Sequence, residues 1–485
     1  MVSKRRDFAV IYINGRRREV RGPEIFQSLS GYLRGELGLT GTKVVCAEGD
    51  CGSCTVIVGR PRNGVIEYSS VCSCITSVYQ VDASHVVTIE GISPGGVLSP
   101  VQEALVQHHG TQCGFCSPGF VLSLHAMFES GTDLTEERLR QGLVGNLCRC
   151  TGYEPILRAA LKIDASRVLK LNRMFDSPVL ASELARCAND PVHIEAAGKV
   201  FYKPVTIAEA AQFKAAHEDC VIVSGGTDLG VQINKGIRTV STILSTVALK
   251  ELQQVEATSR EMIVGAGVPL TELERMAQKP MPEYAKLLGR FGSPQIKNAA
   301  TLGGNIANGS PIGDAIPALF VLNAQVELAG ASGSRRVDIN DFYVGYKKNV
   351  MAADELIVRV FIPRPTADEV FKLYKVSKRR DLDISTFSAA VWMKLSGRRI
   401  EDIRIAYGGV GPMILRLRNA EAHLRGNDVS ERRFESAREI AVQEITPISD
   451  VRGSAEYRNK LAANILRKLY LELSAFSPGP DATYD

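Results

Sequence analysis

Apolar and polar residues alternate near the start of the chain, over residues 8–20. The alternation runs on both sides of Asn14-Gly15, a pair typical of the two-residue turn of a β-hairpin. Residues 24–37 instead repeat apolar side chains every three to four positions, which predicts a helix. Short apolar runs at 55–58 and 86–90 predict further strands. Together these patterns predict a small sheet with one helix.

The spacing of apolar residues becomes helical in the next part of the chain. It predicts a small bundle of helices at 100–109, 118–130, 135–144 and 154–163. Ser117-Pro118 places a capping hydroxyl ahead of a proline at the first position of one of these helices. The segment 165–195 shows no clear period and contains two prolines, so we interpret it as a linker.

The second half of the chain alternates short strands with helices and carries glycine-bearing loops at 224–230 and 301–314. The first strands are predicted at 220–224, 242–245, 262–266, 326–329 and 356–362. The pattern then becomes that of an α+β unit without repeats. Its predicted elements are strands at 370–376, 388–396 and 401–409 and helices near 430–443 and 453–474.

These patterns predict an α+β multidomain protein. The expected divisions are a first unit at 1–91, a helical unit at 92–165, a linker at 166–195, a mixed unit at 196–368 and a C-terminal unit at 369–485.

Composition and charge narrow the classes of function. The 485 residues are 45% hydrophobic and 23% charged, which is typical of soluble globular domains. A net charge of +5 is too small for this length to indicate binding to nucleic acid or to a membrane surface. No long apolar window is free of charges, and the basic start lacks the apolar stretch of a signal peptide. We therefore expect no membrane span and a cytoplasmic location.

Cysteines are concentrated in the first third of the chain, where nine of the eleven lie between residues 46 and 150. Clustered cysteines in a reducing compartment are more often metal ligands than disulfide partners. The other two, Cys187 and Cys220, are predicted to be small buried residues. The histidines show no paired-ligand spacing and no Ser/His/Asp constellation can be assembled, so we predict no catalytic residue in this chain.

The first cysteine set is Cys46, Cys51 and Cys54, with the C-x4-C-x2-C spacing of a plant-type [2Fe–2S] site. Three thiolates from one loop can wrap a flat cluster, and Gly49 and Gly52 let the backbone approach its sulfides. A zinc site would favour two C-x2–4-C pairs and is the weaker alternative. The spacing leaves two candidates for the fourth ligand, namely Cys72 and Cys74.

The second cysteine set combines a C-x2-C pair with a C-x-C pair at predicted helix ends. Unpaired N–H groups there favour a negatively charged cluster. The tight C-x-C pair suits adjacent corners of a two-iron cluster better than a single zinc ion, which is the alternative. The four residues are Cys113, Cys116, Cys148 and Cys150.

Several motifs carry a resemblance to a known family. The stretches CAEGDCGSCTV, QCGFCSPGF and GNLCRCTGYEPI resemble the iron–sulfur portion of the xanthine dehydrogenases, within the molybdenum-containing hydroxylases. The stretches VSGGTDLG, FGSPQIKNAATLGGNIANGSPIGD, GYKKN, YKVSKRRDLDI and AYGGVGP resemble the family's FAD domain and its C-terminal extension. The resemblance covers nearly the whole chain. It implies a ferredoxin-like β-grasp [2Fe–2S] domain, a helical-bundle [2Fe–2S] domain, a PCMH/VAO-type FAD domain and an α+β C-terminal domain, and it favours Cys74 as the fourth ligand.

The resemblance also implies which residues surround the cofactors. Both glycine-bearing loops would offer backbone N–H groups to the flavin pyrophosphate. Taken alone the two loops would be weak signals, because most such glycine pairs are ordinary turns. No GxGxxG Rossmann signature is present, so a classical dinucleotide-binding fold is not supported. Gln112 would reach toward a molybdopterin on a partner subunit, and the run Lys378-Arg379-Arg380 would lie near the flavin, although a solvated surface is the alternative for each. The implied flavin-binding residues are Ile222, Val223, Ser224, Gly225, Gly226, Thr227, Asp228, Leu229, Phe291, Thr301, Leu302, Gly303, Gly304, Asn305, Asp314, Ile357 and Lys375.

By this resemblance the chain would be the electron-transfer subunit of a xanthine dehydrogenase, an oxidoreductase of purine metabolism. A large molybdopterin-binding partner, in an (αβ)2 heterotetramer, would oxidise hypoxanthine and xanthine to urate. Electrons would pass through two [2Fe–2S] clusters to FAD and on to NAD+, with oxygen as the alternative acceptor. Two other functions stay open: the equivalent subunit of a related aldehyde or aromatic-heterocycle hydroxylase, and a non-enzymatic redox sensor, against which the flavin loops argue.

Overall fold

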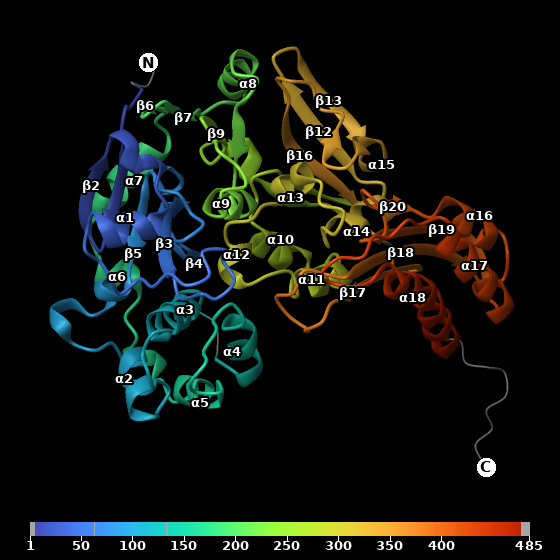
Figure 1. Cartoon of the computed structure of the whole chain (residues 1–485), viewed down its shortest axis with the longest axis horizontal. Coiled ribbons are helices and arrows are strands. Elements are labelled where there is room, and N and C mark those ends of the chain that lie inside the picture. Colours follow the sequence, from blue (N-terminus) through green and yellow to red (C-terminus); the bar gives the residue numbers. More distant parts are fainter. Residues whose placement is uncertain (1–4, 63, 132–133, 477–485) are drawn as a thin grey trace.

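Figure 1 shows the computed structural model of the protein, which describes residues 5–62, 64–131 and 134–476. Within these residues the strands form five sheets. The two N-terminal units stack on one side of the molecule, and the other two follow beside them in chain order (Figure 1). The mixed α+β multidomain architecture predicted from the sequence is confirmed.

The first unit is a five-stranded sheet in the order β2-β1-β5-β3-β4, in which β1 runs parallel to β5 and the other neighbours are antiparallel. The hairpin around Asn14-Gly15 forms as predicted. The predicted helix is shorter, because a 3-10 turn at Gly22–Phe26 precedes α1. The bounds are β1 Ala9–Ile13, β2 Arg16–Val20, α1 Leu29–Gly35, β3 Thr55–Arg62, β4 Val65–Cys72 and β5 Ser84–Val87.

The helical unit contains the four predicted helices and places cysteines at helix ends. Cys116 stands directly before α3, so Ser117 is the first residue of that helix and does not cap it. Thr135 caps α4 with its hydroxyl, which accepts a hydrogen bond from the N–H of Arg138. The bounds are α2 Pro100–Gln107, α3 Ser117–Glu129, α4 Glu136–Gly142 and α5 Glu154–Leu161.

The segment interpreted as a linker is largely structured. It forms α6 (Leu171–Met174) and α7 (Pro178–Ala188), and β6 starts at Val192. The buried residues Leu180, Leu184 and Cys187 lie on one face of α7, which packs against the sheet of the first unit. Their spacing of four and three residues, behind a Ser-Pro start, was a helical signal that the sequence interpretation missed.

The third unit is built on two larger sheets, with orders β6-β7-β9-β8 and β10-β11-β16-β12-β13, and a small β14-β15 hairpin. Its strands are β6 Val192–Ala196, β7 Lys199–Lys203, β8 Val221–Val223, β9 Thr242–Ser245, β10 Val255–Ala257, β11 Glu261–Gly265, β12 Gln325–Gly330, β13 Gly333–Asp338, β14 Tyr343–Gly345, β15 Lys348–Asn349 and β16 Leu356–Pro363. Its helices are α8 Ile207–Ala216, α9 Thr227–Asn234, α10 Leu270–Ala277, α11 Pro282–Leu288, α12 Pro294–Lys297, α13 Leu302–Asn308, α14 Ile316–Val321 and α15 Ile339–Phe342.

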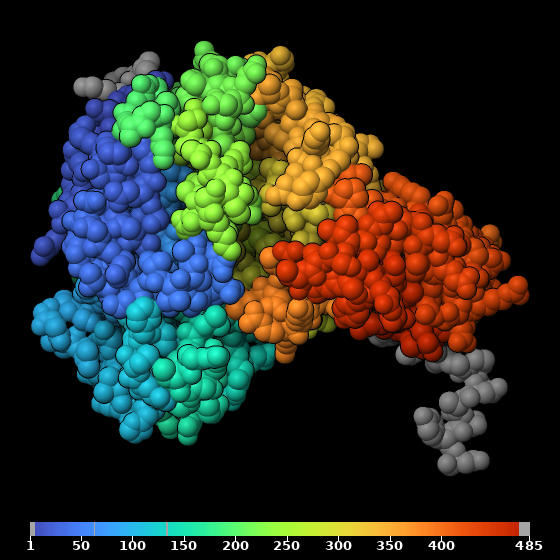
Figure 2. Space-filling model, viewed as in Figure 1, coloured from blue at the N-terminus to red at the C-terminus, as the bar shows by residue number. Residues whose placement is uncertain are grey.

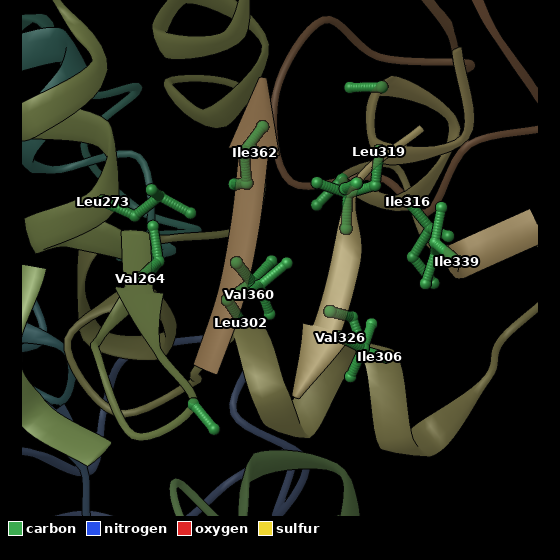
Figure 3. Packing of buried hydrophobic residues seen from close by; sticks show 14 of the residues in the cluster. Val264, Leu273, Leu302, Ile306, Ile316, Leu319, Val326, Ile339, Val360 and Ile362 are labelled. Carbon is green, nitrogen blue, oxygen red and sulfur yellow. The ribbon is translucent and has the colours of Figure 1, made fainter. Parts of the chain in front are cut away.

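The hydrophobic core of the third unit fixes helix α13. Leu302 and Ile306, both fully buried, lie beside Val360 and Val326 of the five-stranded sheet (Figure 3). Burying four such side chains contributes several kcal/mol, at about 1.5–3 kcal/mol each. The start of α13 is therefore held at a defined place over the inner strands of the sheet.

The last unit is an antiparallel sheet, β17-β18-β19-β20, packed against helices as predicted. Helix α14 of the third unit packs on β18 and β19, which joins the two units. The bounds are β17 Glu369–Val376, β18 Phe387–Ser396, β19 Arg399–Gly408, β20 Leu415–Arg416, α16 Arg418–Leu424, α17 Glu431–Gln443 and α18 Ala455–Phe476. None of the helices in the described ranges is long and apolar enough to span a membrane.

A buried ion cluster joins the first and third units. Asp82 accepts hydrogen bonds from both terminal nitrogens of Arg6, at 2.9 and 2.8 Å, and from the ammonium of Lys203 at 2.6 Å. Burial alone would raise the pKa of Asp82, but the charges of Lys203 and Arg6 outweigh burial and lower it. Because removing one member would leave a buried charge uncompensated, this cluster fixes the first sheet against β7.

His85 provides a test of the first unit. Its ring is fully buried, its Nε2 accepts a hydrogen bond from the N–H of Gly15 at 3.1 Å, and its Nδ1 lies 2.8 Å from the Tyr68 hydroxyl. Burial lowers the pKa of His85 to about 4. In the unfolded chain the imidazole would take up a proton near pH 6.5. We therefore expect this site to lose about 2 kcal/mol of stability between pH 7 and pH 5.

Thermal unfolding of the full chain at pH 7 and pH 5 checks this expectation. His85→Gln should lower stability at pH 7 and show a smaller further loss at pH 5 than the wild type. His108→Gln, at an exposed position, is the control and should keep the wild-type pH dependence. An unchanged pH dependence in His85→Gln would show that this ring is not the titrating group.

Candidate functional site: two cysteine sets and a cavity

Five thiols converge where the first cysteine loop meets the end of β4. The Sγ atoms of Cys54 and Cys74 lie 3.2 Å apart, and Cys74 also reaches the thiol of Cys46, which in turn contacts that of Cys51. Cys72 lies beside Cys54 as well, but its thiol points to the carbonyl of Gly49 at 3.5 Å. Cys74 therefore contacts two of the three loop cysteines, which fits it as the fourth ligand.

The backbone of this loop is arranged for negative charge. Hydrogen bonds from the thiols of Cys51 and Cys74 and from the N–H groups of Glu48 and Cys51 lower the pKa of Cys46. Gly49 and Gly52 have φ of +79° and +67°, a left-handed conformation that glycine adopts without steric cost. Converging thiols and inward N–H groups are what an iron–sulfur cluster requires of its ligands.

The second cysteine set also comes together, near the surface of the helical unit. Cys113 and Cys150 are exposed, with Sγ atoms 3.4 Å apart, while Cys116 and Cys148 are half-buried and contact each other. The N–H of Phe115 donates to the thiol of Cys113, which lowers its pKa. All four predicted residues therefore converge, with one pair facing outward and the other inward.

The two cysteine sets are directly connected. The N–H of Leu147, next to Cys148, donates to the carbonyl of Cys51 at 3.0 Å. The amide of Asn146 donates to the carbonyl of Gly52 at 3.3 Å. A single hydrogen bond between backbone groups thus joins a ligand of the first set to the neighbour of a ligand of the second.

A cavity of about 1350 Å³ lies between the first, third and last units. This exceeds the roughly 300–1,000 Å³ of most small-ligand pockets and suits an extended dinucleotide. Figure 2 shows a recess between the segment around residue 230 and the orange-red C-terminal parts. The residues predicted to bind flavin that line the cavity are Ile222, Ser224, Gly225, Gly226, Thr227, Asp228, Leu229, Phe291, Thr301, Gly303, Gly304, Asn305, Asp314, Ile357 and Lys375.

Two of the predicted flavin residues, Val223 and Leu302, do not line the cavity. Their side chains are buried in the hydrophobic core and hold the ends of β8 and α13 in place. Gln112, assigned to a cofactor on a partner subunit, is exposed beside Cys113 and far along the chain from the cavity loops. Gln112, the predicted contact to a partner's cofactor, therefore lies on the helical unit and apart from the predicted flavin contacts around the cavity.

The first glycine-bearing loop presents free donors to the cavity. Gly226 has φ +67° and stands before α9, whose first turn has no side-chain cap. A Cβ at Gly225 would lie 1.9 Å from the carbonyl oxygen of Ala299, so only glycine fits there. The uncapped N–H groups and the helix dipole are the features that binding of a phosphate group requires.

The second glycine-bearing loop differs from the expectation that its N–H groups contact pyrophosphate. The N–H of Leu302 donates to Val268, that of Gly303 to Ala266, and that of Gly304 to the hydroxyl of Thr301. What this loop offers is a side chain, because the amide oxygen of Asn305 is buried without a hydrogen-bond partner. The predicted residues lie at the cavity, but most of their N–H groups are already used by the protein.

Lys375 and Asp314 pair with each other inside the cavity wall. The ammonium of Lys375 donates to the Asp314 carboxylate at 2.5 Å, to the carbonyl of Asp383 at 2.9 Å and to the Ser385 hydroxyl at 2.8 Å. These three bonds use every hydrogen that an ammonium has. The second carboxylate oxygen of Asp314 is buried without a hydrogen-bond partner. Asp314 therefore retains an acceptor for a ligand hydroxyl, whereas Lys375 serves mainly to hold that carboxylate.

The segment of the basic run bridges the cavity and the first cysteine loop. Arg379 lines the cavity and forms an ion pair with Asp383 at 2.5 Å. It also lies close enough to Asp50 for its positive charge to act toward a lower pKa of that carboxyl. Burial and the nearby Cys46 thiol raise the pKa of Asp50. Glu48 and Gly49 also line the cavity, so the first cysteine loop forms one of its walls.

Sequence reasoning missed several polar residues that join the units at this site. Asn234, at the end of α9, donates to the carbonyls of Ala47 and Cys74, both at 2.8 Å. Gln80 donates to the carbonyl of Gly225 at 3.1 Å. Neither residue belongs to a spacing pattern, because each bonds to backbone groups that are distant in the sequence.

Comparisons with known proteins match three parts of the chain to family models. Residues 88–161 match a [2Fe-2S] binding domain, residues 194–365 the FAD binding domain in molybdopterin dehydrogenase, and residues 372–473 the CO dehydrogenase flavoprotein C-terminal domain. The helical unit is thus a [2Fe–2S] domain and the third unit an FAD domain, as the sequence resemblance implied.

Relatives and solved structures agree with these matches. Xanthine dehydrogenase 2 of Arabidopsis thaliana is 31% identical over 96% of this chain, and aldehyde oxidase 2 of Macaca fascicularis is 30% identical over 97%. The chain spans 40% and 39% of the length of these two relatives. Carbon monoxide dehydrogenase from Hydrogenophaga pseudoflava aligns with a TM-score of 0.53 and 25% identity, covering 55% of this chain and 94% of that chain.

Serine substitutions at Cys72 and Cys74 test the assignment of the fourth ligand in the first cysteine set. We expect Cys74→Ser to remove one paramagnetic cluster signal from the reduced protein, because it takes away the thiol that contacts both Cys46 and Cys54. Cys72→Ser is the matched control and should keep that signal and the iron content. The measurement is low-temperature electron paramagnetic resonance with iron analysis. Loss of the signal in Cys72→Ser with its retention in Cys74→Ser would exchange the two assignments.

Gly225→Ala tests the first glycine-bearing loop. The new Cβ would collide with the Ala299 carbonyl and displace the turn, so we expect flavin affinity to fall at least about tenfold. Gly345→Ala, where a Cβ meets no atom within 4 Å, is the control and should bind flavin normally. Flavin content after equilibrium dialysis against FAD measures the difference, and equal content in the two variants would exclude this loop from the binding site.

Proposed function

We propose that this chain, which belongs to the molybdenum hydroxylase family and is homologous to the N-terminal part of xanthine dehydrogenases, is the electron-transfer subunit of a xanthine dehydrogenase. In this proposal a molybdenum centre on a large partner subunit oxidises hypoxanthine and xanthine to urate. Two [2Fe–2S] clusters and FAD, when bound to this chain, supply one-electron relay and two-electron collection, and NAD+ is the final acceptor.

The observation that carries the proposal is the spatial order of the three sites. The second cysteine set has its outer pair, Cys113 and Cys150, exposed. Its inner side meets the first set through the Leu147–Cys51 hydrogen bond, and the first loop forms a wall of the flavin cavity at Glu48. A redox chain that starts at the protein surface and ends at a cavity suits an external electron donor on one side and a diffusing acceptor on the other.

The surface around the second cysteine set supports a protein partner as the donor. Phe115, between two candidate ligands, is 48% exposed, and Val45, beside the first set, is 61% exposed. Exposed aromatic and apolar groups beside a redox site are typical of a protein–protein contact. The partner in this proposal is the molybdopterin-binding subunit, assembled with this chain as an (αβ)2 heterotetramer.

On the acceptor side, the polar residues of this chain that line the cavity bind or orient a cofactor in this proposal, and the chemistry on the organic substrate takes place on the partner. The free N–H groups before α9 hold phosphate, and Asp314 accepts from a hydroxyl of the cofactor. Arg379 puts positive charge at the cavity wall, which favours an anionic dinucleotide. NAD+ as the acceptor agrees with this charge.

The test is co-purification of the chain with its partner, followed by molybdenum analysis and assays with xanthine and NAD+. Xanthine-dependent reduction of NAD+ is the expected result. Turnover of an aldehyde or an aromatic heterocycle, with none of xanthine, would instead assign the chain to a related hydroxylase. A chain that purifies without flavin and shows no NADH:dye activity would overturn the electron-transfer role.

Cys150→Ser separates the two ends of the proposed pathway. Removing this outer thiol should disable the second cluster, so xanthine-to-NAD+ activity should fall at least about 100-fold. NADH-to-dye activity at the flavin should stay within about twofold of wild type, because it does not use that cluster. Cys187→Ser, in the structural helix α7, is the control and should change neither activity. Equal activity of Cys150→Ser and wild type with xanthine would remove Cys150 from the pathway.

A further inference from the structure

We infer that Gln295 is a positioning residue that sets the placement of the two iron–sulfur clusters relative to each other. The inference rests on the proposed function, because it takes both cysteine sets as cluster ligands. Gln295 belongs to the FAD unit, yet its side chain reaches the place where the two cysteine-bearing units meet. It is 1% exposed, so its amide is surrounded by protein groups.

The amide nitrogen of Gln295 donates into both cluster units. It lies 3.0 Å from the Asn146 amide oxygen, 3.0 Å from the Ser123 hydroxyl and 3.4 Å from the Thr55 hydroxyl. Thr55 directly follows Cys54 of the first set. Asn146 stands two residues before Cys148 of the second. One side chain thus touches the neighbours of ligands from both sets.

These acceptors form one connected network. The Ser123 hydroxyl donates to the Asn146 oxygen at 2.8 Å, and the Asn146 amide and the Thr55 hydroxyl both donate to the carbonyl of Gly52, at 3.3 and 2.6 Å. Ser123 lies on α3, which begins directly after the ligand Cys116. A displacement of either cysteine loop would therefore break bonds that pass through Gln295.

The space around the amide is closed by close packing. A Cβ at Gly145 would lie 2.2 Å from the Oε1 atom of Gln295, and this oxygen is buried without a hydrogen-bond partner. Leaving a buried carbonyl oxygen unpaired costs about 1–3 kcal/mol. The hydrogen bonds of the amide nitrogen offset this cost. Together with the close packing against Gly145 they leave the side chain little freedom to rotate.

The backbone that carries Gln295 is itself fixed. The hydroxyl of Ser293 caps α12 by accepting from the N–H of Ile296. Lys297 is paired with Glu274 at 2.5 Å, and the Asn298 amide donates to the carbonyl of Ser70 at 2.9 Å. Because the helix is anchored on both sides of Gln295, the side chain can act as a fixed reference for the two loops that it bonds.

The main variant is Gln295→Met, which keeps length and volume but removes both donors. We expect each cluster to keep its own signal and its iron, and flavin to stay bound. The magnetic interaction between the two reduced clusters, measured as low-temperature splitting of their electron paramagnetic resonance lines, should fall to half or less of the wild-type value, because the two loops lose their common anchor. A purely structural role would lower the melting temperature and leave this splitting unchanged.

Gln325→Met is the matched control. It makes the same substitution in the same unit, but the bond it breaks reaches Asp338 and no cysteine loop. The control should keep the wild-type splitting. If Gln295→Met does not fold, Gln295→Asn, which keeps the donors one methylene shorter, decides the question by the same measurement.

The outcomes are distinct. Wild-type splitting in the folded Gln295 variant, equal to that of Gln325→Met, overturns the inference while leaving the proposed function standing. A wild-type protein with fewer than two cluster signals overturns the proposed function, and the inference falls with it.

Discussion

The two cysteine loops can touch only because glycines leave room between their backbones. A Cβ at Gly52 would lie 2.2 Å from the carbonyl oxygen of Gly145, and a Cβ at Gly119 would lie 2.3 Å from the carbonyl oxygen of Gly52. Real Cβ atoms essentially never come closer than 3.0 Å to such a group. Any side chain at these positions would push the helical unit away from the first sheet. The hydrogen bond between Leu147 and Cys51, and with it the order of the three sites, depends on this contact.

The cavity also lies where several units meet. Its walls come from the first cysteine loop, both glycine-bearing loops of the FAD unit and the segment around Arg379 of the last unit. A ligand that binds only when these walls are together stabilises their association by mass action. Cofactor binding and domain packing therefore reinforce each other. The buried cluster of Arg6, Asp82 and Lys203 holds two of the units together even without that contribution.

Local signals in the sequence predicted much of the fold and of the site. The Asn-Gly hairpin, the four helices around the second cysteine set and the strands of the last unit depend on nearest-neighbour patterns, and each forms as expected. Cysteine spacing predicted which thiols converge, because ligand spacing is also local. Helix α7 was missed although its spacing was helical, since two prolines suggested a linker. Gln295, Asn234 and Gln80 carry no local signal, because each bonds to a unit distant in the chain.

The cavity shows a subtler limit of motif reasoning. Motif residues that resemble flavin contacts were all assigned to the ligand, yet several hold the wall instead. The N–H groups of Leu302, Gly303 and Gly304 donate hydrogen bonds to other groups of the protein. The ammonium of Lys375 donates its three hydrogens to Asp314, Asp383 and Ser385. A buried ion pair of this kind contributes little net stability, but removing either partner is costly. Lys375 is therefore constrained as strongly as a ligand contact, because it fixes the one carboxylate oxygen that Asp314 keeps free. A motif identifies the residues that a binding site requires. Only the structure distinguishes the residues that contact the ligand from those that fix the position of the contacting residues.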